Sequence, residues 1–382
     1  MASCRLEKTL MKKNPDKNIE LLRQEIFAID EQIFLLAKRR EKISAQIGEA
    51  KRKVDLADKD YNREKLVFQK ALERAGNLDL PKNFAIDLQT LLISLSLSRQ
   101  ERDRIKELKS NSQLSICVIG GAGRLGSWLC RFFADSGHQI HVIDKIKPNF
   151  MCSFSDSIDD NVAFHDIIVV ATPIRESIKI LQKLESCSLK KSVIFDVSSV
   201  KTPIKNHLLA LQSKGIKATS LHPMFGPSVE ILFGKHIIIT SIGNSEADNA
   251  AKNLFLSTSL NIVDMSIDEH DQVISYLLSL SHLINIIFIK TLKNSGFNSK
   301  FLSDFSSPTF SNLLSIARKV FSENPQLYFE IQALNPHNKD VYEQLLKILK
   351  NCIELIKNKD EKSFVSLMEL GKLYLNPSQT TK

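Results

Sequence analysis

Apolar residues near the N-terminus recur at alternating steps of three and four, a spacing that predicts a long helix with one buried seam. The seam positions are Ile19, Leu22, Ile26, Ile29, Ile33, Leu36, Arg40, Ile43, Ile47 and Ala50. Such a helix is about 45 Å long at 1.5 Å per residue. Two shorter helical segments follow, at 58–74 and 81–106, and cannot cover this length. We therefore expect a second subunit to pack along the helix, as an intertwined homodimer.

A polar segment at 107–113 separates this helical region from alternating strand-like and helical runs. Strands are expected at 114–119, 139–143, 166–171, 192–197, 218–221 and 236–240. This alternation predicts a Rossmann-type, doubly wound α/β sheet. From Asp268 the pattern is helical again, with a long apolar helix over 273–292. The sequence thus predicts an all-α domain at 1–108, an α/β domain at 114–267 and an all-α C-terminal domain at 268–382.

Composition agrees with a soluble multidomain protein, since the 382 residues are 43% hydrophobic and 25% charged. The net charge of +9 is dispersed without a long basic run, which argues against nucleic acid and suits small anionic substrates. Six cysteines show no CxxC pair and no metal-ligand spacing, so we expect reduced thiols and no metal. No apolar run approaches the roughly 18 residues that span a membrane, and we expect a cytoplasmic protein.

The segment GlyGlyAlaGlyArgLeuGly at 120–126 predicts a dinucleotide site, because a strand precedes it and a helix follows. Gly121 would permit the tight turn, Gly123 the approach of the pyrophosphate, and Gly126 close packing of helix and strand. Asp144, which ends the next strand, would bind the ribose 2′-hydroxyl and favour NAD over NADP, although neighbouring Lys145 leaves that preference open. The predicted cofactor-binding set is Gly121, Gly123, Arg124, Leu125, Gly126, Asp144, Thr172 and Pro173. The alternative is a glycine turn without a ligand.

Arg40 stands on the seam of the first helix, where a charge is costly unless an anion pairs with it. Lys51 follows three helical turns later on the same face, and Ser96 and Gln100 form an i, i+4 pair on the third helix. Taken singly, Arg40 could pair with a core carboxylate such as Glu64, and Lys51 could be solvated. Together these cations and hydrogen-bond donors suit a small dicarboxylate ligand.

The run LLRQEIFAIDEQIFLLAKRREKISAQIGEAK, followed by DKDYNREK, resembles the helical chorismate mutases of bacteria over about residues 19–105. The resemblance implies pocket residues at Arg23, Arg40, Lys51, Asp60, Arg63, Glu64, Ser96 and Gln100. It also implies an intertwined dimer whose long helix lends Arg23 to the partner's site. The implied reaction is the Claisen rearrangement of chorismate to prephenate, in which arginines hold the two carboxylates and Lys51 and Gln100 contact the ether oxygen.

The strings DVSSVK (196–201) and LHPMFGP (221–227) resemble prephenate dehydrogenase, and EHD (269–271), SSP (306–308) and NPQLYFEI extend the likeness to about residue 370. His222 follows a strand end and can titrate near working pH, so it is the candidate proton acceptor for the substrate's ring hydroxyl. The resemblance implies that Ser199 contacts that hydroxyl and His222, and that His282 lines the pocket. Where the family has an arginine for a substrate carboxylate, this chain has Lys319, beside Arg318.

A mutase joined to this dehydrogenase is the arrangement of the bifunctional T-proteins of enterobacteria. The implied function is conversion of chorismate to prephenate and then, with NAD, to 4-hydroxyphenylpyruvate and carbon dioxide on the path to tyrosine. Tyrosine is a candidate feedback inhibitor. Two alternatives stay open: a different Rossmann dehydrogenase with a helical dimerisation arm, and a non-catalytic NAD-sensing protein whose helical ends recruit partners.

Overall fold

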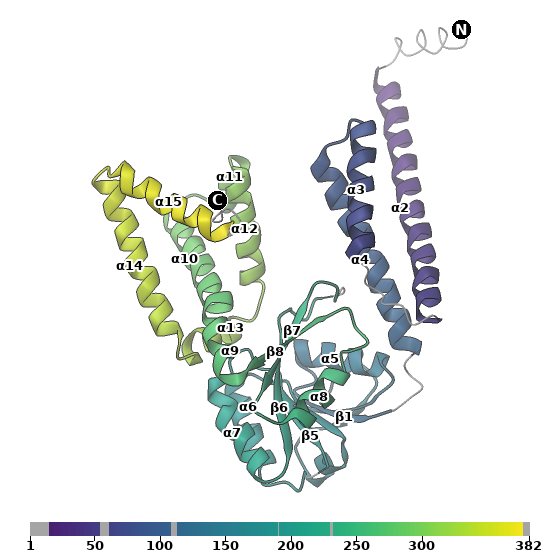
Figure 1. Cartoon of the computed structure of the whole chain (residues 1–382), viewed down its shortest axis with the longest axis vertical. Helices are drawn as coiled ribbons and strands as arrows, with labels where there is room; N and C mark the ends of the chain where they lie inside the picture. The colour runs from purple at the N-terminus through teal and green to yellow at the C-terminus, as the bar shows by residue number, and fades with distance from the viewer. Residues whose placement is uncertain (1–14, 54–60, 108–112, 190, 230–231, 377–382) are drawn as a thin grey trace.

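The computed structural model describes residues 15–53, 61–107, 113–189, 191–229 and 232–376. Three parts follow one another along the chain (Figure 1): a helical bundle, a sheet layered with helices, and a second group of helices. This arrangement confirms the predicted fold class. The first break coincides with the end of helix α4 at Glu107, and the second lies between strand β8 and helix α9, at Ser266.

The N-terminal bundle consists of α2 (Pro15–Lys53), α3 (Tyr61–Asn77) and α4 (Lys82–Glu107). Helices α2 and α4 run parallel, because Arg40 contacts Ser96 and, further along both helices, Ser44 contacts Gln100. The predicted seam is not buried within one chain: its apolar side chains from Ile19 to Ile47 are 47% to 62% exposed. This exposure agrees with the expectation that α3 and α4 cannot cover the length of α2, and burial of the seam by a second subunit stays a prediction.

The central sheet has eight strands in the order β3-β2-β1-β4-β5-β6-β7-β8, all parallel to their neighbours except the antiparallel pair β6 and β7. The strands are β1 (Ser115–Ile119), β2 (Gln139–Ile143), β3 (Ser153–Ser155), β4 (Ile167–Val170), β5 (Val193–Asp196), β6 (Lys217–Pro223), β7 (His236–Ser241) and β8 (Asn261–Ser266). Strands β3 and β8 were not predicted. The carboxyl ends of β1, β4, β5 and β6 share one edge of the sheet, where ligands bind in such folds.

Helices cover both faces of this sheet: α5 (Arg124–Asp135), the 3-10 helix η2 (Asp160–Phe164), α6 (Ile174–Leu184), α7 (Thr202–Ser213) and α8 (Ser245–Asn253). One core cluster includes Phe132, Phe133 and Phe255, and the other includes Leu181 and Leu208. Burial on both faces explains why the central strands are continuous apolar runs rather than alternating ones.

The C-terminal helices are α9 (Ile267–Ile274), the π-helical turn η3 (Ser275–Leu280), α10 (Ser281–Asn294), α11 (Ser299–Asp304), α12 (Pro308–Phe321), α13 (Pro325–Leu334), α14 (Asn338–Lys357) and α15 (Glu361–Leu375). The apolar helix predicted at 273–292 begins earlier, at a capping box in which Ser266 and Glu269 bond each other's backbone. The wider π turn in its middle changes which side chains share a face.

The run from Ile267 to Asn294 is long and apolar enough to cross a membrane, with a mean hydropathy of 1.7 in its most apolar window, of which 17% is buried. The expectation that the chain has no such segment is therefore wrong by length and composition. The same run carries His270 and Asp271, which are 0% and 1% exposed and hydrogen-bonded to the α/β part. These contacts pack the first turns of the run, in α9, on the α/β part.

Candidate active sites

The glycine turn after β1 brings backbone atoms too close together for side chains. A Cβ on Gly126 would lie 2.1 Å from the Gly120 carbonyl oxygen, and one on Gly121 would lie 2.7 Å from Val142. The left-handed backbone of the turn belongs to Gly120, with φ of 89°, and not to Gly121 as expected. Gly120 was therefore missed as the turn residue, although the Gly120–Gly121 doublet was visible in the sequence.

The groups around this turn fit a dinucleotide. Helix α5 has Gly123 as its N-cap and no side-chain cap, so its first amides remain directed at the space above the turn. Asp144, at the end of β2, accepts hydrogen bonds from the Ala122 amide at 2.9 Å and the Ile146 amide at 3.3 Å. The amides suit a pyrophosphate and the fixed carboxylate suits a ribose hydroxyl.

A cavity of about 480 Å³ opens between this edge of the sheet and the C-terminal helices. The predicted residues that line it are Gly123, Arg124, Leu125, Thr172, Pro173, Ser199, His222 and His282. The C-terminal helices add Glu323, Tyr328 and Glu330 to its wall. The carboxylate of Glu330 accepts a bond from the Ile174 amide at 2.9 Å, which anchors α13 on the N-terminus of α6. Residues from both parts of the chain therefore form one site.

His222 lies at the end of β6 and is held by a buried chain of hydrogen bonds. Its Nδ1 lies 2.9 Å from His270 Nε2, and His270 Nδ1 lies 2.8 Å from an Asp271 carboxylate oxygen. Because the carboxylate can only accept, His270 donates from Nδ1 and accepts at Nε2. His222 then donates from Nδ1, which leaves its Nε2 unprotonated. This tautomer is the one that a proton acceptor needs.

Asp271 is fixed by the backbone amides of Lys201 and Thr202, at 2.8 Å and 2.7 Å. Burial alone would raise the pKa of Asp271, but hydrogen bonds from His270, Thr202 and the backbone lower it, so the carboxylate stays ionised. Fully buried Lys201 bonds Asp196 at 3.1 Å and the Leu221 carbonyl at 2.7 Å. This network positions β5 and β6 beside α9.

Burial lowers the pKa of His222 well below its usual 6.5, and the neighbouring His270 and Lys201 lower it further. Burial is also the main reason that the pKa of His270 is lowered, although Asp271 opposes it. Both imidazoles are therefore neutral at pH 7. A neutral His222 with a free Nε2 can accept a proton.

His282 lies on α10, beyond the π turn. Twelve residues separate His270 from His282, and a regular α-helix would place their side chains about 120° apart around the helix axis. The π turn rotates less per residue, so this angle is smaller. Its ring stacks on Tyr328 with centroids 4.2 Å apart, and burial lowers its pKa to about 4. Its buried Nδ1 has no hydrogen-bond partner among the described residues. A buried polar atom in a cavity wall is a natural contact for a ligand.

Arg318 and Lys319 are not brought into this cavity. Both lie exposed in the last turn of α12, and the cavity wall begins again only at Glu323. The only cationic side chain among the described residues that line the cavity is Arg124. The structure thus does not support the expected carboxylate contact from either Arg318 or Lys319.

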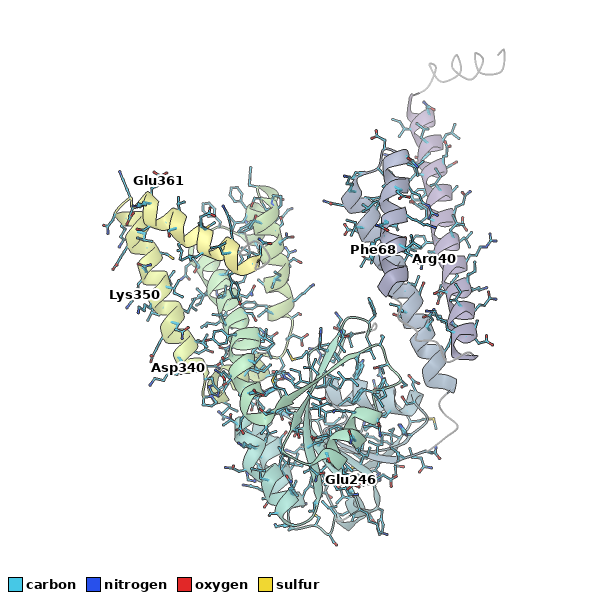
Figure 2. All side chains as sticks on the ribbon, viewed as in Figure 1. Arg40, Phe68, Glu246, Asp340, Lys350 and Glu361 are labelled. Atoms are coloured by element: carbon cyan, nitrogen blue, oxygen red, sulfur yellow. The ribbon has the colours of Figure 1, made fainter. Side chains whose placement is uncertain are left out.

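The predicted mutase residues gather between α2 and α4. Arg40 points from α2 toward α4 (Figure 2), where its Nη1 donates to the Leu92 carbonyl and to Ser96 Oγ, both at 2.6 Å. One turn further, Gln100 donates to the Ser44 carbonyl at 2.6 Å. Lys51 is half-buried at the end of the same face. Arg40, Ser96 and Gln100 thus share one interface, and Lys51 stands three turns beyond Arg40 on α2.

Arg23 lies far from this cluster on the same helix. It is exposed, beside Glu20 at 3.5 Å, and about 25 Å along the helix axis from Arg40. No bending of a side chain closes that distance, so Arg23 cannot join Arg40 within one chain. Asp60 lies outside the described residues, as do the side chains of Arg63 and Glu64.

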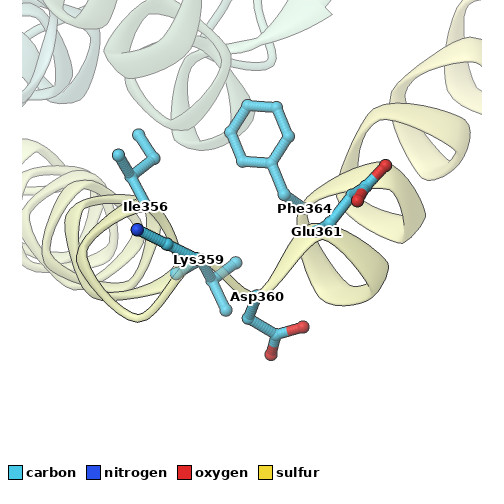
Figure 3. A pocket seen from close by; sticks show the side chains of 6 residues that line it. Ile356, Lys359, Asp360, Glu361 and Phe364 are labelled. Atoms are coloured by element: carbon cyan, nitrogen blue, oxygen red, sulfur yellow. The ribbon is translucent and has the colours of Figure 1, made fainter.

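A smaller hollow of about 300 Å³ lies at the corner between α14 and α15. Ile356 and Lys359 face Phe364 across it (Figure 3), and Asp360 and Glu361 stand at its rim. It contains none of the predicted site residues and no catalytic arrangement among the described side chains. We assign no chemistry to it.

Comparison with known proteins identifies the parts separately. The profile of chorismate mutase type II matches residues 22–101. The profile of the prephenate dehydrogenase nucleotide-binding domain matches 142–263, and that of the prephenate dehydrogenase dimerization domain matches 266–370. The T-proteins of Haemophilus influenzae and Enterobacter agglomerans are each 22% identical to the chain and cover 90% of it, over 89% and 90% of their own lengths.

The chain belongs to the bifunctional chorismate mutase/prephenate dehydrogenase family. Within the dehydrogenase part, a probable arogenate/prephenate dehydrogenase of Methanocaldococcus jannaschii is 27% identical over 68% of this chain, and the match spans 60% of that protein. The prephenate dehydrogenase of Aquifex aeolicus, solved with hydroxyphenyl propionate and NAD+, shares the fold with a TM-score of 0.57 at 19% identity. It covers 69% of this chain and 98% of its own.

Proposed function

We propose that residues 1–108 rearrange chorismate to prephenate and that residues 114–267 and 268–382 together oxidise prephenate, with NAD, to 4-hydroxyphenylpyruvate and carbon dioxide. The observation that carries this proposal is the pairing of two different sites in one family member. One is a neutral proton acceptor beside a glycine turn, and the other is a row of cations and donors in a helical bundle. The domain limits and the residue roles below are part of the proposal.

In the dehydrogenase site, His222 Nε2 accepts the proton of the substrate's ring hydroxyl. NAD, held by the first amides of α5 and by Asp144, would supply the hydride acceptor for the carbon that bears this hydroxyl. The ring carboxylate then leaves as carbon dioxide, and its electron pair completes the aromatic ring. Asp271 and His270 keep the Nε2 of His222 free and stabilise the imidazolium that forms. Ser199 and His282 face the same cavity and orient the substrate.

The mutase reaction needs no nucleophile, because the rearrangement is unimolecular. The bundle must hold the extended substrate in its reactive conformer and place positive charge where the ether bond breaks. Arg40 holds a carboxylate, with Ser96 fixing its guanidinium. Lys51 and Gln100 donate to the ether oxygen, and Asp60, Arg63 and Glu64 complete the pocket. Chorismate consumption in the absence of NAD tests this activity and separates it from a dehydrogenase with an inert helical arm.

The mutase site is completed by a second copy of the chain. The exposed seam of α2 supplies an apolar surface along its whole length, and Arg23 is too far from Arg40 to serve the same site in one chain. In an intertwined homodimer, each α2 brings Arg23 to the partner's Arg40. The C-terminal helices, which match a dimerization domain, add a second contact.

Mixed dimers test this arrangement. We expect Arg23→Ala and Arg40→Ala each to lose mutase activity alone, and co-expression of the two variants to restore roughly a quarter of it. Half of the dimers are mixed, and one of their two sites is then intact. Mutase turnover of the co-purified mixture is the measurement.

The matched control pairs Arg40→Ala with Gln100→Ala. Both residues come from the same interface of one chain, so each site of the mixed dimer lacks one of them and no activity should return. Recovery in this control, or none in the Arg23 and Arg40 pair, would contradict the proposed sharing of the site.

We also propose a cytoplasmic location, since the membrane-length helix found among the described residues packs its first turns on the α/β part, and two T-proteins align with 90% of the chain. Tyrosine is proposed as a feedback inhibitor, because it shares the phenol and the side-chain carboxylate of the product. Loss of NADH formation on adding tyrosine would test this.

A further inference from the structure

An ion pair between two cavity-lining residues, Arg124 and Glu323, joins distant parts of the chain at the dehydrogenase cavity. Nη1 of Arg124, the first residue of α5, lies 2.8 Å from a carboxylate oxygen of Glu323, in the link between α12 and α13. Both side chains line the cavity, and they are 56% and 27% exposed. The pair therefore joins the rim of the glycine turn to the C-terminal helices, within reach of solvent and of a ligand.

Arg124 stands where the cofactor's negative charge must be held. The uncapped N-terminus of α5 directs its amides at the pyrophosphate position, and Arg124 is the only cation among the described residues of the cavity wall. A guanidinium binds phosphate oxygens and carboxylate oxygens with the same donors. Glu323 and a pyrophosphate thus require the same atoms of Arg124.

The position of Glu323 is set by several contacts. A Cβ on Gly226 would lie 3.5 Å from one Glu323 carboxylate oxygen, so that oxygen packs on the loop after β6. Burial raises the pKa of Tyr328, and the charge of Glu323 raises it further. Glu323 is held at the junction of α5, the β6 loop and α13, where an approaching anion meets it.

We propose that Glu323 competes with the cofactor's pyrophosphate for Arg124 and thereby weakens dinucleotide binding. In the structure Arg124 is paired with Glu323, and cofactor binding would require it to exchange this partner for the phosphate oxygens. The exchange releases the link between α12 and α13 from the glycine turn, so cofactor occupancy is coupled to the wall of the substrate cavity. Glu323 is a positioning residue, since it acts through Arg124. The inference rests on the proposed NAD-dependent function.

The test is NADH binding to the full-length protein, followed by energy transfer from its single tryptophan. Trp128 lies on α5, with its ring 5.1 Å from that of Phe225 in the cavity wall, and reports on a bound dihydronicotinamide. We expect Glu323→Gln to lower the Kd for NADH by roughly two- to fivefold, the range expected for loss of a half-exposed competing ion pair. A merely structural loss would weaken binding.

A double-mutant cycle identifies the route. Arg124→Gln should weaken NADH binding, and adding Glu323→Gln in that background should change the Kd no further. Tightening that persists without Arg124 would mean direct repulsion of the phosphate and would overturn the proposed exchange, as would an unchanged or raised Kd for Glu323→Gln alone. If the wild type itself bound no NADH, the proposed cofactor would fail instead.

The control is Glu246→Gln. Glu246 lies in the first turn of α8 (Figure 2) and forms an exposed ion pair with Lys217, away from the cavity. The substitution Glu246→Gln makes the same chemical change in another surface ion pair. Because this pair lies away from the cavity, we expect no change in the Kd for NADH. Mutase turnover should stay at the wild-type rate in all of these variants.

Discussion

His222→Asn is expected to lower kcat for NADH formation from prephenate by about 10²- to 10⁴-fold, the usual contribution of a general base. Asparagine can still donate to His270, but it cannot accept a proton at working pH. The KM for prephenate should change little, because the interaction is made as the hydroxyl proton is lost. The measurement is steady-state kinetics at saturating NAD.

Mutase turnover in His222→Asn should remain at the wild-type rate, and prephenate should accumulate. The control is His236→Asn, at an exposed histidine that begins β7 in the same sheet. Full NADH formation by His222→Asn would remove His222 from the mechanism.

Asp271→Asn tests the same base, His222, through the two hydrogen bonds that join Asp271 to it by way of His270. The amide can donate to His270 Nδ1, which turns the hydrogen-bond chain around and places a proton on the Nε2 of His222. We expect a loss of at least about 10²-fold in kcat, as for other buried aspartates that fix a catalytic histidine. An Asp271→Asn enzyme with normal kcat would show that the relay does not set the tautomer.

Arg40→Ala is expected to lower mutase turnover by about 10²- to 10³-fold, the cost of removing one preorganised charge from a transition state. The vacated guanidinium site would leave Ser96 without its donor and the substrate carboxylate without its cation. Chorismate consumption without NAD gives the rate, while NADH formation from added prephenate should be unchanged.

The matched control is Arg39→Ala, one residue earlier on the same helix and exposed to solvent. It removes the same charge without touching the interface of α2 and α4. Equal losses in Arg39→Ala and Arg40→Ala would indicate a general charge effect and contradict the proposed pocket.

The regular helices and strands could be predicted from the sequence, because burial of one face makes apolar residues recur at the repeat of the helix or strand. The helices of the bundle and six strands lie close to their predicted places, while β3 is too short and β8 too exposed to give a pattern. Periodicity also marks the apolar face of α2 without saying which chain covers it. The seam was thus correctly found, its exposure in the single chain agrees with the expectation, and its burial by a second chain stays a prediction.

The site was predicted in part. His222, Ser199 and His282 were found through local strings and do line one cavity. His270 and Asp271 were missed as partners of His222, because 48 residues separate the two histidines and only the fold brings them together. The one available signal was the string GluHisAsp itself. Lys319 was placed by a spacing along α12 that ignores which way the helix faces, and it lies outside the cavity wall.

NADH formation from chorismate as the sole organic substrate tests the two-step account most directly. Wild-type protein with NAD should produce NADH after a lag, while prephenate accumulates. His222→Asn should consume chorismate without NADH, and Arg40→Ala should form NADH only when prephenate is supplied. NADH from prephenate but never from chorismate would contradict a mutase in this chain, and chorismate consumption without NADH in the wild type would contradict the dehydrogenase.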